Sequence, residues 1–524
     1  MWIFARYWLA LFLTLMTSVA LIEIAHSASN LNTAAVVRTD SGLVRGVVGQ
    51  GIVSYKGIPY VAPPIGELRW RPPQPTEAWS GIYEADAFGP ICPQRGSLFP
   101  PLPIGETSED CLTLNVWAPA GQAEGSAPVM VWIHGGGYRR GLGSSPLYDG
   151  TKLAEQGVVV VTFNYRLGRL GFFTHPSLSI AQADELLGNY GFMDQIAVLE
   201  WVQRNIGAFG GDPDNVTIFG ESAGGGSVNF LMISPQAKGL FHRAIAQSAG
   251  NGMAVDQHLT ETRGRARSLE EIGKEFAANL GVKEDGDLIA NLRALSVDQV
   301  MSETPQGGAL SGPVVDGNLI PDSIALLFSQ GKQHDVPYLA GGNSWEGAIV
   351  AQSPGAYDSF FHGRDMTEIE ALYGKRTQTD MVQAWFGDAT FLSPARYLVT
   401  EMANVSSASY LYHFSYVTGS QRTNMPGVPH GGEIAYVFGT LPTMTDQVTD
   451  RDIALSKLVS AYWVQFARTG DANGGGRPKW PAYSREQDVL LEFGDNILLH
   501  ANLLKQRLDF HEYEYKMSGT EADQ

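Results

Sequence analysis

The most constraining feature of this chain is a run of β-favouring residues that leads directly into Gly-x-Ser-x-Gly. The run covers residues 216–219 and continues into Gly220, Glu221, Ser222, Ala223 and Gly224. A serine becomes a useful nucleophile when a sharp strand-to-helix turn holds it exposed beside a base. In a chain with 60 glycines the five-residue pattern also arises by chance, so other motifs must support it. With that support, it predicts a strand, a nucleophile turn at Ser222 and a helix.

A second glycine-rich segment supports this interpretation. Residues 128–133 have the composition of a buried strand and end in His134-Gly135-Gly136-Gly137. Acyl transfer places negative charge on the former carbonyl oxygen, and glycines let backbone N–H groups approach that oxygen. The strand before the glycines and the serine turn after them disfavour a merely flexible turn. We expect the N–H groups of Gly136, Gly137 and Ala223 to form an oxyanion hole.

The general base must be sought among 11 histidines. His430 lies in a loop framed by Pro429 and Gly431 and followed by an apolar run, which is typical of a residue presented at a strand end. His134 belongs to the glycine loop. Packed or solvated roles are expected for four histidines in helical or strand-like segments: His242, His258, His334 and His413. The pattern therefore favours His430 as the base.

Two carboxylates compete for the third position of a Ser-acid-His triad. Glu346 follows the apolar run 336–340, just past the end of a predicted core strand, where ligands and catalytic groups gather in open α/β sheets. Asp316 precedes Gly317, and Asp-Gly is a common turn pair. We interpret Asp316 as structural and Glu346 as the acid.

The chain resembles the type-B carboxylesterases, the cholinesterase/lipase group of the α/β-hydrolases. Besides the two glycine-rich motifs, the matching segments are 56–60, 68–70, 108–115, 164–166, 189–191, 209–213, 313–317 and 429–431. The resemblance implies Ser222 as nucleophile, Glu346 as acid and His430 as base. It also favours Glu346 over Asp316, because this family uses a glutamate in that loop.

The arrangement of segments predicts one large domain. The length of 524 residues alone suggests about three domains, but no linker, repeat or long charge run divides the chain. Strand-like runs alternate with helical stretches at 129–133, 158–163, 216–219, 244–247, 336–340 and 410–416. This alternation predicts an α/β fold with a large, mostly parallel central sheet flanked by helices. We expect helical insertions near the active site at 251–310 and 353–405, and a last long helix at 452–469.

The N-terminus predicts export. Arg6 precedes an apolar run at 7–22 and small residues at 25–28, so we expect residues 1–28 to be a signal peptide and 29–524 to form the single domain. The alternative is an uncleaved anchor, but the run is shorter than the ~20 residues that span a membrane. We therefore expect a secreted or periplasmic enzyme with no stable membrane association. The net charge of −18 disfavours nucleic acid as a partner.

The only two cysteines are Cys92 and Cys111. An isolated pair in an exported protein usually forms a disulfide, and the resemblance implies the same pairing. Two buried thiols are the alternative. The segment between them has Phe99 as its only aromatic residue and includes Arg95. Choline-ester specialists of the family stack the cation on a tryptophan in this loop, so neutral aryl or short-chain esters are the expected substrates.

The expected function is serine-dependent hydrolysis of small carboxylic esters through an acyl-enzyme intermediate. No metal or organic cofactor is expected, because the chain lacks His-Glu-x-x-His, Cys-x-x-Cys and a strand-to-helix Gly-x-Gly-x-x-Gly. One alternative is a lipase that acts on longer-chain esters. Another is a binding protein on the same fold, which the complete set of triad and oxyanion residues disfavours.

Overall fold

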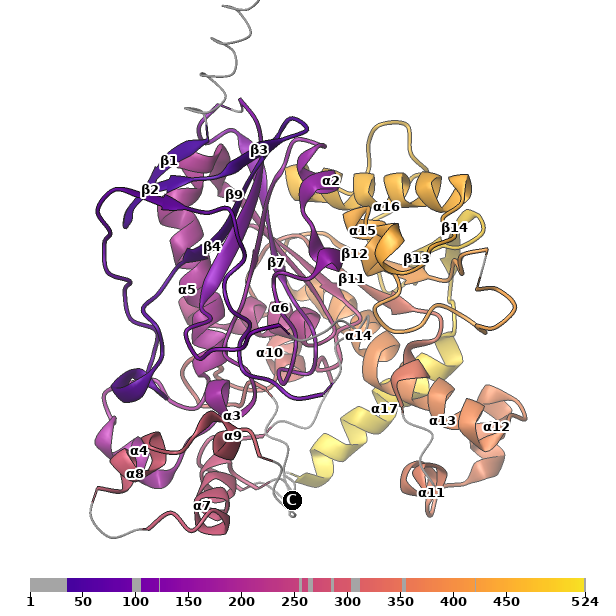
Figure 1. Cartoon of the computed structure of the whole chain (residues 1–524). Coiled ribbons are helices and arrows are strands. Elements are labelled where there is room, and N and C mark those ends of the chain that lie inside the picture. The colour runs from indigo at the N-terminus through magenta and orange to yellow at the C-terminus, as the bar shows by residue number, and fades with distance from the viewer. Residues whose placement is uncertain are drawn as a thin grey trace, which may run out of the picture.

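The computed structural model describes residues 35–96, 105–121, 123–253, 257–262, 267–283, 287–302, 312–350, 355–419 and 421–522. The predicted signal peptide lies outside these residues. The described part is built around a twisted central sheet with helices on both faces (Figure 1). None of its helices is both long and apolar enough to cross a membrane.

The central sheet has the strand order β14-β13-β12-β11-β10-β9-β7-β8-β6-β4-β3. Its parallel strands are β7 (Ala127–Ile133), β8 (Val159–Phe163), β9 (Gly211–Glu221), β10 (Arg243–Gln247), β11 (Tyr338–Asn343), β12 (Ser409–Phe414) and β13 (Val489–Phe493). Antiparallel strands extend both edges: β3 (Val47–Gly49), β4 (Ile52–Pro59) and β6 (Thr113–Pro119) on one side and β14 (Ile497–Ala501) on the other. A small second sheet contains β1 (Val36–Thr39), β2 (Gly42–Arg45) and β5 (Ile82–Glu84).

The central parallel strands are mostly buried because helices cover both of their faces. Every residue of β7 is buried, and its side chains alternate between two cores. Val129 and Val131 pack in the core that includes α5 (Tyr190–Asn205) and α6 (Ala223–Ile233). Trp132 packs in the opposite core, beside α16 (Asp450–Thr469). The predicted mostly parallel sheet flanked by helices is confirmed.

The remaining helices include two groups inserted after neighbouring strands. Between β10 and β11 lie α7 (Leu269–Asn279), α8 (Leu288–Arg293), α9 (Val297–Val300) and α10 (Ile324–Ser329). Between β11 and β12 lie α11 (Ala356–Phe361), α12 (Met366–Tyr373), α13 (Gln378–Gly387), the π-helix η6 (Asp388–Leu392) and α14 (Ser393–Glu401). Short helices elsewhere are α2 (Thr151–Ala154), α3 (Gly168–Gly171), α4 (Pro176–Ala181) and α15 (Ile434–Phe438).

The C-terminal part differs from the sequence prediction. Helix α16 begins at Asp450, where Thr449 caps it, so the helix predicted at 452–469 exists. The prediction that it is the last long helix was wrong, because α17 (Lys505–Ala522) follows and packs beside α14 (Figure 1). Charged residues are distributed along α17, so its sequence lacks the apolar stripe by which α16 was found.

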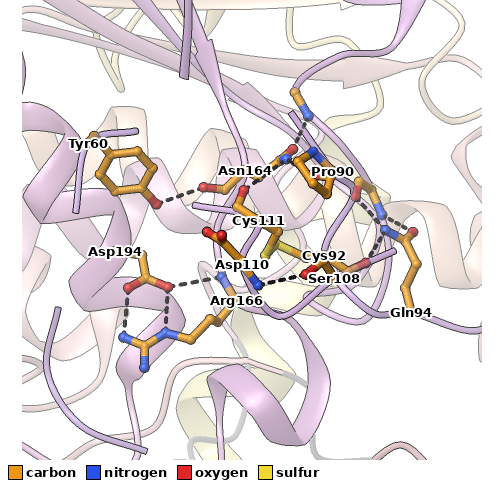
Figure 2. Close-up of a disulfide and its surroundings, with 12 residues drawn as sticks. Tyr60, Pro90, Cys92, Gln94, Ser108, Asp110, Cys111, Asn164, Arg166 and Asp194 are labelled. Atoms are coloured by element: carbon orange, nitrogen blue, oxygen red, sulfur yellow. Dashed lines mark hydrogen bonds and ion pairs between the residues drawn. A yellow bond between two sulfur atoms is a disulfide. The ribbon is translucent and has the colours of Figure 1, made fainter. Parts of the chain in front are cut away.

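Cys92 and Cys111 form a disulfide with an S–S distance of 2.02 Å, and both are buried (Figure 2). Its surroundings are strongly hydrogen-bonded. Asn164 Nδ2 donates to the Cys111 carbonyl oxygen at 3.2 Å, and the buried Arg166 guanidinium contacts the Asp194 carboxylate at 2.7 Å. Because Asn164 directly follows β8, its hydrogen bond attaches Cys111 to the central sheet.

We expect the disulfide to stabilise the folded protein measurably. A loop of this length, with 19 residues of sequence separation, contributes ~3 kcal/mol in the chain-entropy model. The double variant Cys92→Ser/Cys111→Ser should lower the free energy of unfolding by about this amount in a urea titration. Unreduced wild-type protein should also resist alkylation after denaturation. Two alkylated cysteines in protein recovered from an oxidising compartment would contradict the prediction.

Candidate active site

The predicted site residues gather at the carboxyl ends of the parallel strands. Ser222 follows β9 directly, and the glycine loop follows the neighbouring β7. Glu346 lies just past β11 and begins the 3-10 helix η5 (Glu346–Ile349). His430 lies between β12 and α15. Because parallel strands end at one edge of a sheet, these distant segments meet at one place.

Ser222 lies on the sharp turn that the sequence predicted. Its φ is 58° and its ψ is −123°, a strained conformation for a residue other than glycine. The Ser222 N–H donates to the Gln247 carbonyl oxygen at 3.0 Å, which ties the turn to the neighbouring strand β10. A Cβ on Gly224 would collide with the carbonyl oxygen of Ile133. The glycine is therefore required by close packing of α6 against β7.

The glycine loop lies against the serine turn. A Cβ on Gly135 would be 3.0 Å from the Cβ of Ser222. Gly136 has φ of +110° and Gly137 has φ of +64°, and the space beside Gly137 is open. Among the described residues, no backbone acceptor takes the N–H of Gly136, Gly137 or Ala223. Ala223 begins α6, where N–H groups have no partner within the helix. The three N–H groups are therefore available to a ligand.

Glu346 and His430 form a buried pair. His430 Nδ1 lies 2.6 Å from Glu346 Oε2. The other oxygen of Glu346, Oε1, accepts from Ser248 Oγ at 2.6 Å and from the Asn343 N–H at 2.6 Å. The carboxylate is thus held from both sides and faces the imidazole with one fixed oxygen. This arrangement keeps the proton on Nδ1 and leaves Nε2 as the basic nitrogen.

The loop that carries His430 is anchored to the loop that carries Glu346. The N–H of Trp345 donates to the Val428 carbonyl oxygen at 2.9 Å. Asn343 Nδ2 donates to the Pro429 carbonyl oxygen at 3.1 Å and to the buried carboxylate of Glu433. The aromatic ring of Phe391, from η6, packs on the imidazole with 4.6 Å between ring centroids. These contacts fix the imidazole plane.

The second carboxylate beside the imidazole is Glu221, the residue before Ser222. Its Oε1 lies 3.1 Å from His430 Nε2, although neither atom has a hydrogen-bond partner among the described residues. Burial raises the pKa of Glu221 to about 8. Burial lowers the pKa of His430, but the charges of Glu221 and Glu346 outweigh it and raise that pKa to about 9. Because the two groups lie 3.1 Å apart, the protonation state of each one shifts the pKa of the other.

These shifts predict the pH dependence of hydrolysis. The imidazole must be neutral to accept a proton, and its pKa is raised, so activity should increase with pH with a midpoint above 6.5 and no higher than about 9. The variant Glu221→Gln removes one supporting charge and should move the midpoint down. Profiles of kcat/KM from pH 5 to pH 10 measure the midpoint of the wild type and that of the variant. A wild-type midpoint below 6.5 would contradict the assignment.

Other residues considered from sequence have different surroundings. Asp316 accepts hydrogen bonds from the backbone of Asn318 and Ile320, as expected of a turn residue. His134 stacks on Tyr165 at 4.4 Å, and burial lowers its pKa to about 4, so it is neutral. In the described part of the chain, neither residue has a hydrogen bond, ion pair or ring contact with Glu346 or His430.

Sequence reasoning missed three neighbours of the imidazole–carboxylate pair. Glu221 could have been found, because it occupies the variable position inside Gly-x-Ser-x-Gly. Ser248 and Phe391 carry no local signal, because each reaches the site from a separate loop or insertion. The insertion after β11 does border the site, as expected, since Gln383 of α13 accepts from Trp345 Nε1 at 2.9 Å.

The fold and this arrangement define an α/β-hydrolase. Residues 33–371 and 370–511 match the model of the carboxylesterase family, and the chain belongs to that family.

The chain is 37% identical over 480 residues to the fumonisin B1 esterase of Sphingopyxis macrogoltabida, covering 88% of this chain and 86% of that protein. It is 34% identical to the para-nitrobenzyl esterase of Bacillus subtilis, covering 87% and 94%. A solved PNB esterase superposes with a TM-score of 0.77 at 32% identity, covering 91% of this chain and all of that one. The protein is a carboxylic ester hydrolase that acts on small-molecule esters.

Proposed function

We propose that Ser222, His430 and Glu346 form the catalytic triad of this esterase. The observation that carries the proposal is the 2.6 Å contact between His430 Nδ1 and Glu346 Oε2, beside a serine on a strained turn. His430 Nε2 takes the proton of Ser222 as the hydroxyl attacks the ester carbonyl. Glu346 orients the imidazole and stabilises its protonated form.

The oxyanion of the tetrahedral intermediate is bound by the N–H groups of Gly136, Gly137 and Ala223. These groups are fixed before the substrate arrives, so they stabilise the developing charge without reorganising. His430 then gives its proton to the departing alcohol, which leaves an acyl group on Ser222. Water repeats the sequence with the same base, and the carboxylic acid is released.

A fluorophosphonate probe tests this assignment, because it mimics the tetrahedral intermediate and labels an activated serine. We expect the purified enzyme to hydrolyse 4-nitrophenyl butyrate and to lose that activity as one probe molecule adds. Mass spectrometry should locate the probe on Ser222. Labelling at another serine with Ser222 unmodified would overturn the assignment.

We also propose that residues 1–28 are removed as a signal peptide and that 29–524 form one exported domain. The buried disulfide supports an oxidising destination. Expression with the native leader in an export-competent bacterial host tests this. N-terminal sequencing of the exported protein should begin near residue 29, and recovery only of uncleaved cytoplasmic protein would contradict it.

A further inference from the structure

Two arginines stand beside the candidate oxyanion loop in a chain whose net charge is −18. Arg139 and Arg140 follow the loop after Tyr138, and both are exposed. Their N–H groups both donate to the Gly136 carbonyl oxygen at 3.2 Å. The backbone of both residues is therefore tied to a proposed oxyanion donor.

The side chain of Arg140 runs from the oxyanion loop to the disulfide loop. A Cβ placed on Gly136 would lie 3.0 Å from Arg140 Cγ, and a Cβ placed on Gly96 would lie 3.5 Å from Arg140 Nη1. Throughout the described part of the chain, no carboxylate pairs with this guanidinium. An exposed arginine without a counter-ion in an acidic protein can bind an anion.

A second arginine, Arg95, lies on the segment that is hydrogen-bonded to the residue after Arg140. Gln94 Nε2 donates to the Gly141 carbonyl oxygen at 2.9 Å, and the Gly141 N–H donates to Gln94 Oε1 at 2.8 Å (Figure 2). Because Gln94 precedes Arg95 and Gly141 follows Arg140, this double hydrogen bond brings the backbone segments of the two arginines close together. Arg95 contacts Asp298 at 3.2 Å, but Asp298 is almost fully exposed, so the pair is weak.

The buried carboxylates around the site have partners or are held neutral. On the disulfide loop, Glu109 is paired with the guanidinium of Arg69, whereas Glu106 and Asp110 are exposed. Glu346 is paired with His430, and burial raises the pKa of Glu221, which favours its neutral form. Remote acidic residues act little here, since charge is screened over ~8 Å at physiological salt. Arg140 therefore places a guanidinium that has no counter-ion among the described residues beside the candidate oxyanion loop.

We propose that Arg140, assisted by Arg95, binds an ionised carboxylate of the substrate, so that the preferred esters carry a second, free carboxylate near the scissile bond. The inference rests on the proposed function and specifies its substrate class. A guanidinium binds a carboxylate through two parallel hydrogen bonds, which a neutral ester cannot form. Esters with one ionised carboxylate are therefore preferred over the neutral esters expected from sequence.

The test compares matched charged and neutral esters. One arm places the charge in the acyl half, with mono-4-nitrophenyl adipate against 4-nitrophenyl methyl adipate. The other places it in the alcohol half, with 3-carboxyphenyl butyrate against its methyl ester. In at least one arm the charged ester should have a kcat/KM about tenfold higher, and 0.5 M NaCl should reduce that ratio.

Variants connect the preference to the arginines. Arg140→Gln should lower the charged-to-neutral ratio about tenfold, and Arg140→Lys should retain a larger part of it. Arg45→Gln is the matched control, because Arg45 is a surface arginine paired with Glu84 on the small sheet, and it should leave the ratio unchanged. A ratio of one or less in both arms, or a ratio that Arg140→Gln does not change, would overturn the inference. Hydrolysis of the neutral esters in that case would leave the proposed triad standing, whereas hydrolysis of neither ester would overturn both.

Discussion

Ser222→Ala is expected to lower kcat/KM by about four to six orders of magnitude while the protein folds normally. The hydroxyl is the proposed nucleophile, so its removal leaves only oxyanion and binding effects. The turn itself does not depend on that hydroxyl. It is held by the Ser222 N–H bonded to Gln247 and by the Ser222 carbonyl, which accepts from Gly226 at 2.8 Å. Alanine keeps the Cβ and therefore adds no new strain.

Steady-state hydrolysis of an aryl ester, with thermal unfolding measured in parallel, checks this prediction. Ser329→Ala is a suitable control, because Ser329 is an exposed serine near the end of α10, away from the glycine loop. Its activity should equal that of the wild type. Wild-type activity in Ser222→Ala would show that another residue is the nucleophile.

The central sheet was predictable because its strands have a simple physical signature. Parallel strands covered on both faces are mostly apolar, so β7 appears as an uninterrupted apolar run and β8 as an apolar run broken only by Thr162. The turn at Ser222 and the loop at His430 were predictable because glycine and proline mark backbone geometry. Their mutual approach was inferred from the rule that catalytic groups gather at the carboxyl ends of such strands.

The remaining features depend on tertiary contacts that no local pattern encodes. Ser248 reaches Glu346 across 98 residues of sequence, and a lone serine after a strand has many ordinary roles. The short strands β13 and β14 and the charged helix α17 were missed because their sequences contain no long periodic pattern. The pKa shift of Glu221 likewise follows from burial in the folded site, which its place in the motif does not reveal.

Glu346→Gln is expected to reduce kcat/KM by about four orders of magnitude, approaching the loss in His430→Ala. The reason lies in the two donors that fix Oε1 of Glu346, Ser248 Oγ and the Asn343 N–H. A glutamine at this position must turn its carbonyl oxygen toward the backbone donor, so its NH2 group faces His430 Nδ1. Nδ1 must then accept, which leaves the proton on Nε2, where it blocks the transfer from Ser222.

The chain supplies a closely matched control for this substitution. Glu492 also accepts from a serine hydroxyl, Ser415 Oγ at 2.6 Å, and also contacts a histidine, His500 Nε2 at 2.6 Å, but it lies on β13. Glu492→Gln should therefore keep activity within about twofold of wild type, since it changes the same kind of trio without touching the proposed base. Measurement of kcat/KM for both variants at the wild-type optimum pH shows whether Glu346 sets the protonation of His430. Equal, small losses in the two variants would show that Glu346 serves the fold and does not set the protonation of His430.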